Sequence, residues 1–245
     1  MKNHFTIVIP SFNNERWVKK NLTSALKQEY ENFCVSYTDD ASTDKTYELA
    51  EEIIGNSNVD ACLIRNETNK RALHNIVKSV EKSKPDSIIL TLDGDDWLPH
   101  PQVLSTLNEI YSNPDVWITS GSYIDNSNGL VSSPVIKEGF WENNIRHLIW
   151  TISHLRTFRR ELFLSINQED LKDKDNEFYK FTFDQAMMFP MVEMSGPKHF
   201  HAIDEVLYVY NRNNPNSVDR IHRHEQLRIE QDIRRKKPYL RKENL

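Results

Sequence analysis

The sequence predicts an α/β fold with a mostly parallel central sheet that is flanked by helices. Two observations support this fold class. Short β-rich runs and helical patterns alternate four times before residue 100, with connecting loops that suit crossovers between parallel strands. The run from Ile88 to Leu92 is uncharged and rich in β-branched and leucine residues, which is typical of a strand buried on both faces.

The expected elements follow the chain in a regular order. We expect strands at residues 5–9, 33–37, 61–64, 88–92, 116–123 and 203–210. Amphipathic helices are expected at residues 17–26, 47–54, 70–81 and 103–111. Residues 125–133 are polar and predict a loop, and residues 220–245 predict a basic helical tail.

Composition narrows the class of protein. A chain of 245 residues can bury a substantial core without disulfides, and its two cysteines, Cys34 and Cys62, are interpreted as small core residues in a reducing compartment. The net charge of −5 gives no general attraction to nucleic acid. No apolar run approaches the ~18 residues of a membrane span, and Pro10 ends the first apolar run too early for a signal peptide. We therefore expect a cytoplasmic protein.

Three carboxylates, Asp93, Asp95 and Asp96, follow the central strand directly. Crowding acids at a strand tip costs free energy unless a cation or hydrogen-bond donors compensate. Hard oxygen ligands favour Mg²⁺ or Mn²⁺, and Gly94 permits a close backbone approach. The alternative interpretation is an acidic turn that caps the following segment.

Other polar residues fall at the ends of the remaining predicted strands. Pro10, Asp39, Asn69 and Asp95 each follow a strand of the expected parallel sheet. Ligands of such sheets bind at the carboxyl ends of the strands. The sequence therefore predicts one binding site at this edge.

Three strings in order carry a resemblance to a known family. Residues 7–14 (IVIPSFNN), 39–44 (DDASTD) and 92–96 (LDGDD) resemble the family 2 glycosyltransferases of the GT-A fold, which is Rossmann-like. The resemblance continues through residues 153–159 and 184–190 and covers most of residues 5–215.

The resemblance implies an inverting, metal-dependent glycosyltransferase. A hexosyl or N-acetylhexosaminyl group would move from a nucleoside diphosphate sugar, with a UDP-sugar as the first candidate, to a hydroxyl of a glycan, a lipid-linked acceptor or a protein. One domain would span residues 1–219, with a nucleotide-binding half at 1–98 and an acceptor half at 99–219, and the tail would follow at 220–245. The competing function is a non-catalytic subunit that binds nucleotide sugars.

The resemblance also assigns residues to the donor nucleotide. Pro10, Phe12 and Asn14 would lie along it, Asp39 would accept a hydrogen bond from the base, and Arg71 would approach the base or the phosphates. An ionised carboxylate only accepts, which suits the N3–H of uracil or thymine. The alternatives are core packing for Phe12, a helix-capping acid for Asp39 and a solvated helix charge for Arg71.

The metal and phosphate contacts are implied in the same way. Asp95 would be the principal ligand of Mn²⁺ or Mg²⁺, Asp93 would reach the ribose or a metal-bound water, and Asp96 could share the coordination. The metal would offset the charge that develops on the leaving diphosphate. His154 and Arg156 would lie near the phosphates, although a purely structural histidine is an open alternative.

The acceptor side is marked by Asp184 and Trp141. Asp184 stands between aromatic and apolar residues at a predicted helix start and matches the family's catalytic acid, so it would deprotonate the acceptor hydroxyl. Phe183 occupies the preceding position, which is often Glu in the family, and a helix N-cap is the alternative role for Asp184. Trp141 would stack on a sugar ring or, alternatively, pack in the core.

The tail after residue 220 is basic, whereas the remainder of the chain is acidic. Such a helix could contact an anionic membrane surface or a lipid diphosphate acceptor. We favour a solvated helix that packs on the domain or on a second subunit of a homodimer. Nucleic-acid binding is not expected, because the overall charge is negative.

Overall fold

The computed structural model describes residues 2–134, 136–137, 139–215 and 221–245. Its centre is an eight-stranded sheet in the order β3-β2-β1-β4-β7-β5-β6, with β8 paired to β5. The strands are β1 (Phe5–Ser11), β2 (Phe33–Asp39), β3 (Ala61–Arg65), β4 (Ile88–Thr91), β5 (Ile118–Asp125), β6 (Val131–Ser132), β7 (Arg156–Arg159) and β8 (Phe200–Tyr210).

Most of the strands run in one direction. β1 is parallel to β2 and β4, and β2 is parallel to β3. β7 runs antiparallel to both β4 and β5, which restores the common direction in β5 and in its parallel neighbour β8. The predicted mostly parallel sheet is therefore confirmed, but the insertion of β7 between β4 and β5 was not predicted.

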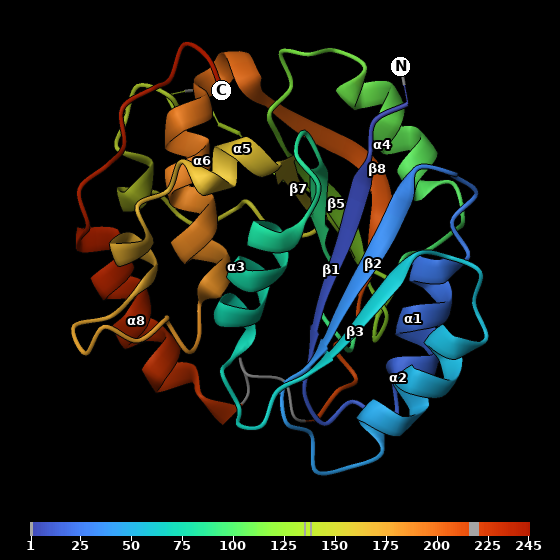
Figure 1. Ribbon diagram of the computed structural model, residues 1–245. Helices are drawn as coiled ribbons and strands as arrows, with labels where there is room; N and C mark the ends of the chain where they lie inside the picture. The colour runs from blue at the N-terminus through green and yellow to red at the C-terminus, as the bar shows by residue number, and fades with distance from the viewer. Residues whose placement is uncertain (1, 135, 138, 216–220) are drawn as a thin grey trace.

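Helices cover both faces of the sheet. They are α1 (Val18–Leu26), α2 (Thr46–Gly55), α3 (Ala72–Lys82), α4 (Val103–Tyr111), α5 (Arg160–Leu164), α6 (Phe183–His199) and α8 (Arg223–Arg235), with short 3₁₀ helices η1 (Ile145–His147) and η2 (Gln168–Leu171). Figure 1 shows α1, α2 and α4 on one side of the sheet and α3, α5 and α6 on the other. The result is a three-layer arrangement.

Alternation along β1 feeds two apolar cores. Ile7 and Ile9 point into the core that contains α1, α2 and α4, whereas Val8 points into the core that contains α3 and α6. Successive side chains of a strand face opposite sides of the sheet, so a continuous apolar run is what a doubly covered strand requires. The two cores therefore lie on the two faces of the sheet, and loops such as those after β1 and β4 lie at the carboxyl-terminal edge of the strands.

Two local expectations are wrong. The polar segment 125–133 contains β6, which pairs with β5 through Tyr123 and Ile124. Cys62 is exposed, so it is not a core residue, while Cys34 is half-buried. The reason is that β3 lies at the edge of the sheet and only part of its surface is covered.

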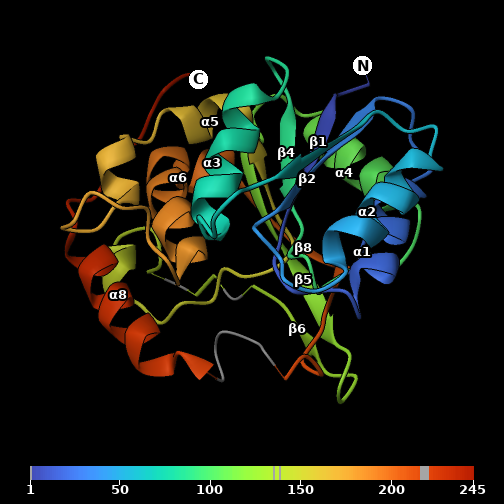
Figure 2. The same cartoon turned by 60° about the horizontal axis from the view of Figure 1, so that its bottom comes forward.

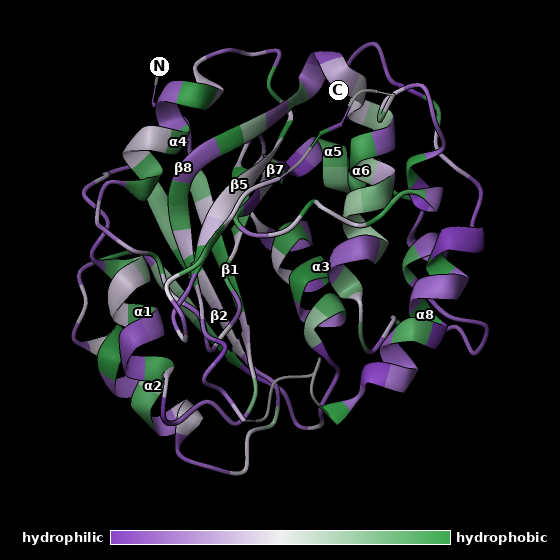
Figure 3. Cartoon of the chain, turned by 180° about the vertical axis from the view of Figure 1, so that it is seen from behind, coloured by the Kyte–Doolittle hydropathy of each residue, from purple (hydrophilic) through white to green (hydrophobic). Residues whose placement is uncertain are grey.

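The basic tail packs on the rest of the chain. Ile233 of α8 is buried, its carbonyl accepts a hydrogen bond from Arg146 Nη1 at 2.8 Å, and Tyr179 donates its hydroxyl to Asp232. Figure 2 shows α8 beside α6, and Figure 3 shows that much of its surface is hydrophilic. Among the described residues, no helix is both long and apolar enough to cross a membrane.

Candidate active site

A cleft of about 890 Å³ lies at the carboxyl-terminal edge of the sheet. Most of the residues that the sequence assigned to a site line this one cleft, although they come from five different segments of the chain. They are Pro10, Phe12, Asn14, Arg71, Asp93, Asp95, His154, Arg156 and Asp184. Asp39, Asp96 and Trp141 are outside its described lining.

The negative charge of Asp93 is balanced by two neighbouring side chains. Its Oδ2 accepts hydrogen bonds from His154 Nε2 and from Arg156 Nη2, each at 3.2 Å. Burial alone would raise the pKa of Asp93, but the Arg156 guanidinium and the His154 imidazole outweigh it and lower the pKa to about 2. Asp93 is therefore ionised at neutral pH.

His154 is held by its neighbours and faces the cleft at the same time. Its ring stacks on Tyr208 and Tyr210, with ring centroids 4.5 and 5.0 Å apart, and its Nδ1 lies 3.0 Å from Ser153 Oγ. Burial and the charge of Arg156 lower the pKa of His154, against the opposing effect of Asp93. The ring is therefore held structurally, and its role near the metal or the phosphates stays a prediction.

Asp95 and Asp96 have separate environments. Asp96 is fully buried, and its two oxygens accept hydrogen bonds from Tyr208 Oη at 2.6 Å and from the Asn211 backbone N–H at 2.7 Å. Burial and the charges of Asp95 and Asp93 raise the pKa of Asp96 well above its ordinary value. Asp95 lines the cleft and accepts from Asn214 Nδ2 at 2.7 Å. Asp96 therefore joins the end of β8 to the loop after β4.

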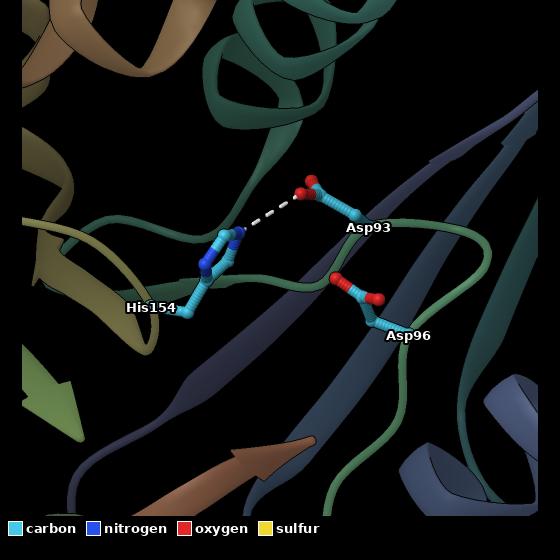
Figure 4. A group of neighbouring side chains, drawn as sticks. All are labelled: Asp93, Asp96 and His154. Carbon is cyan, nitrogen blue, oxygen red and sulfur yellow. Dashed lines mark hydrogen bonds and ion pairs between the residues drawn. The ribbon is translucent and has the colours of Figure 1, made fainter. Parts of the chain in front are cut away.

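The donor set suits a divalent cation. Asp93, Asp96 and His154 each offer a ligand atom, and these atoms lie within 4.8 Å of one another, with the three side chains converging as Figure 4 shows. Carboxylate and imidazole ligands are compatible with Mn²⁺, and carboxylates with Mg²⁺. Both oxygens of Asp96 already accept hydrogen bonds, whereas Asp93, Asp95 and His154 line the cleft. The structure thus groups Asp93, Asp96 and His154 as candidate ligands, and Asp95 is a further acid that lines the cleft.

The loops after β1 and β2 form the opposite wall. Phe12 is 42% exposed and lines the cleft, which excludes its packing in the core. Asp40 accepts the backbone N–H groups of Lys70 at 2.8 Å and Arg71 at 2.7 Å, so it fixes the loop before α3. Arg71 itself has a φ of 72°, and its guanidinium lies 5.7 Å from the Phe181 ring centroid. It is not a freely solvated helix charge.

Asp39 is fully buried beneath this wall. Its Oδ2 accepts from the Ser42 backbone N–H at 3.1 Å and lies 3.9 Å from Arg65 Nε. Within the described parts of the chain, its Oδ1 has no hydrogen-bond partner. A buried carboxylate oxygen without a donor is costly, so Asp39 has capacity for one more hydrogen bond.

Asp184 lies in the first turn of α6. Thr182, not Asp184, is the N-cap residue, so the capping alternative for Asp184 is wrong. Its Oδ2 accepts a hydrogen bond from Trp150 Nε1 at 3.1 Å. Burial alone would lower the pKa of Arg156, but the charges of Asp93 and Asp184 raise it.

The structure favours the core alternative for Trp141 over stacking on a sugar ring. Trp141 packs edge-on against Phe140 and Phe200, at 4.9 and 5.5 Å between ring centroids, and the structure does not bring it to the cleft. Trp150, which touches Asp184, is the tryptophan near the site. Tryptophan spacing alone could not separate the two, because both follow similar apolar and basic residues.

The tail helix forms a wall of the cleft that sequence reasoning missed. His222, Gln226 and Glu230 line it, and the His222 ring stacks on Phe181 at 4.7 Å between centroids. The residues recur every four positions, which is a helical face. That periodicity was the available signal, but it does not reveal what the face contacts.

The sheet is mostly parallel, and a cleft lined by carboxylates lies at the ends of its strands. The protein is therefore of the α/β class that binds ligands at the carboxyl ends of the strands. Within that class, the chain belongs to glycosyl transferase family 2, whose profile matches residues 6–168.

Curated relatives share part of the chain. An uncharacterized glycosyltransferase of Haemophilus influenzae is 31% identical over 119 residues, which are 48% of this chain and 46% of that protein. The putative glycosyltransferase EpsE of Bacillus subtilis is 32% identical over 91 residues, which are 37% of this chain and 32% of that protein. The matched regions thus span less than half of either relative.

Solved structures confirm the GT-A fold. Mannosyltransferase PcManGT from Pyrobaculum calidifontis, in complex with GDP-Man and Mn²⁺, has a TM-score of 0.67 at 17% identity and covers 98% of this chain and 66% of its own. S. aureus TarS 1-349, in complex with UDP, has a TM-score of 0.62 at 18% identity and covers 85% and 60%. At these identities the likeness establishes the fold.

Proposed function

We propose that the chain is a metal-dependent, inverting glycosyltransferase that uses a nucleoside diphosphate sugar. The observation that carries this proposal is that Asp93, Asp95 and Asp184 line one cleft, which Arg156 also lines and where it donates to Asp93. Membership of glycosyl transferase family 2 supports it, as do related structures that bind UDP, or GDP-Man and Mn²⁺.

The donor nucleotide would lie along the loops after β1 and β2. Exposed Phe12 offers an apolar surface to the base or the ribose, and Arg71 offers a cation near the phosphates. The unused Oδ1 of Asp39 is buried beneath this wall, so a shift of the loop after β2 would have to expose it to the base. It would then favour a base that carries an N–H donor, because an ionised carboxylate only accepts. Uracil meets this requirement, so a UDP-sugar is the first candidate.

Asp95, Asp93 and His154 would hold the cation. When bound there, Mn²⁺ or Mg²⁺ would offset the charge that develops on the leaving diphosphate. Arg156 keeps Asp93 ionised and adds a fixed positive charge at the same end of the cleft. Asp96 would orient the loop through Tyr208 and Asn211 without facing the donor.

The transfer step needs one base. Asp184 would take the proton of the acceptor hydroxyl, whose oxygen forms a bond to the anomeric carbon while the bond from that carbon to the diphosphate oxygen breaks. The electron pair of the broken bond leaves with the diphosphate. A single displacement inverts the anomeric carbon. The Trp150 indole N–H would orient the carboxylate through Oδ2 and leave its other oxygen for the proton.

Donor binding is tested by calorimetry with UDP, dTDP and GDP, each with and without Mn²⁺. We expect metal-dependent binding of UDP that weakens by at least about tenfold in Asp95→Asn, because a lost ligand of the cation removes on the order of 1.4 kcal/mol or more. Asp204→Asn removes an exposed acid of β8 outside the cleft and should leave binding unchanged. Equal binding by wild type and Asp95→Asn would remove Asp95 from the metal site.

The base is tested separately with Asp184→Asn. We expect this variant to bind UDP and Mn²⁺ normally and to lose at least about 100-fold in sugar transfer or donor hydrolysis, which is the usual contribution of a general base. Near-normal turnover would remove Asp184 from this role. A wild-type chain that binds donor but shows neither reaction would support the non-catalytic alternative, which Phe183 before Asp184 favours.

A further inference from the structure

A second cavity of about 880 Å³ adjoins the cleft. It lies between residues 144–150 and the carboxyl-terminal half of α8 with the residues that follow, and we call it the basic groove. Gln185 and Glu230 line both the groove and the cleft, so the two spaces meet at these side chains. Trp150 lines the groove and donates to Asp184, which ties it directly to the proposed base.

The charge of the groove is positive and only partly compensated. Arg146 is paired with Glu193 at 2.6 Å, and Arg234 with Glu230 at 2.6 Å. Lys236 donates to two backbone carbonyls at 3.0 Å and lies 3.9 Å from Asp170. Arg235 and Lys237 also line the groove, are exposed, and have no carboxylate within 4.0 Å among the described residues. These last two cations are available to an anion.

Where the groove meets the cleft, the available group is a hydrogen-bond acceptor. Gln185 is 6% exposed, and its Oε1 has no hydrogen-bond partner within the described ranges. An unused amide oxygen next to Asp184 suits a hydroxyl donor, because leaving it unpaired costs free energy. The groove therefore combines a hydroxyl-binding end near the base with an anion-binding end along α8.

We propose that the basic groove binds the acceptor, and that this acceptor is a phosphate-bearing saccharide. A hydroxyl of the saccharide would reach Asp184 past Gln185, and its phosphate would lie against Arg235 and Lys237. This inference rests on the proposed function for the identity of the reacting end. A neutral glycan could donate a hydroxyl near Asp184 but has no anion for Arg235 and Lys237. A phosphate-bearing saccharide can contact both ends of the groove.

The test measures binding of glucose 1-phosphate and of inorganic phosphate by calorimetry, with EDTA present so that no metal-dependent donor site contributes. We expect the wild type to bind glucose 1-phosphate more tightly than phosphate. The double variant Arg235→Gln with Lys237→Gln should weaken the binding of glucose 1-phosphate and of phosphate by about tenfold, as the loss of two charge pairs predicts. The matched control, Lys174→Gln with Arg228→Gln, removes two exposed cations outside the groove and should stay within about twofold.

Further measurements distinguish a soluble sugar phosphate from a lipid surface as the ligand, and distinguish this proposal from the proposed function. Gln185→Ala should abolish the preference for glucose 1-phosphate over phosphate. Retention on phosphatidylglycerol vesicles without binding of glucose 1-phosphate would overturn the proposal in favour of a lipid surface. Equal weakening in the two double variants, or no binding by folded wild type, would also overturn it. Asp95→Asn should bind glucose 1-phosphate normally, and the Arg235 and Lys237 variant should bind UDP with Mn²⁺ normally, so either proposal can fail alone.

Discussion

Gly94 shows how a single residue sets the geometry of the cleft. A Cβ built at this position would lie 2.6 Å from Ser11 Oγ, 2.7 Å from Ser11 Cβ and 2.8 Å from Asn14 Nδ2. Ser11 is the last residue of β1 and Asn14 lies in the loop that follows, where Asn14 Nδ2 donates to Ser11 Oγ at 3.0 Å. The absence of a side chain at Gly94 therefore lets the loop after β1 pack directly on the loop that carries the acids.

We predict that Gly94→Ala destabilises the protein by about 1–3 kcal/mol, as overpacking of a closed site does, and that it weakens nucleotide binding. Urea unfolding and calorimetry with UDP and Mn²⁺ measure the two effects. Gly55→Ala is the matched control, because nothing lies within 4 Å of the added methyl at the end of α2. Equal unfolding midpoints for the two variants would contradict the close-packing argument.

The residues also mark the limit of what a motif can predict. The pattern of Asp93, Asp95 and Asp96 indicated an acidic site at the end of β4, and the structure brings Asp93 and Asp95 to the cleft. It could not indicate that Asp96 is internal, because its partners Tyr208 and Asn211 are 112 and 115 residues away in the chain. Local spacing carries no information about such contacts.

At the scale of elements, the alternation of strands and helices through α4 was predictable, because each element shows its own hydrophobic periodicity. The position of β7 was not predictable, since a four-residue strand between β4 and β5 depends on long-range pairing. The tail helix was predicted as an element, but its contacts depend on side chains such as Tyr179, which lies more than 40 residues before it.

Tyr179 links this helix to the domain in a pH-dependent way. Burial, and then the hydrogen bond to Asp232 and its charge, raise the pKa of the Tyr179 hydroxyl above its ordinary value. A raised pKa contributes stability that is fully present below the unfolded-state pKa of about 10 and is lost as the pH rises above it. The hydroxyl should therefore stabilise the packing of α8 at neutral pH and lose this effect in alkali.

We predict that Tyr179→Phe costs about 1–1.5 kcal/mol at pH 8, the usual value of a lost buried hydrogen bond. The difference in the free energy of unfolding between wild type and variant should be smaller by about 1 kcal/mol at pH 10.5 than at pH 8, because only the wild type has the Tyr179 hydroxyl that titrates. Urea unfolding at the two pH values measures both numbers. The other tyrosines titrate alike in both proteins and cancel. A difference that does not change with pH would contradict the assignment.

Across the whole molecule, charge is divided unevenly. Residues 220–245 contain nine Lys and Arg against four Asp and Glu, whereas residues 1–219 contain 22 against 32. The basic tail thus packs on an acidic body, and it supplies both a wall of the cleft and most of the cations of the basic groove. The family profile ends at residue 168, so α6 and α8 lie outside it, whereas residues 144–150 of the basic groove lie within it.

We predict that a chain ending at Pro215 is less stable than the full chain by at least about 3 kcal/mol. The truncation exposes the surface that Ile233 covers, worth about 1.5–3 kcal/mol for one isoleucine, and it removes the carbonyl that Arg146 Nη1 contacts. It also removes the bond from the Lys242 N–H to the Met194 carbonyl at 2.8 Å. Urea unfolding followed by circular dichroism measures the change. A chain that ends at Lys242 loses only exposed residues and is the control. If the Pro215 chain unfolds at the same urea concentration as this control, the tail is not part of the folded domain.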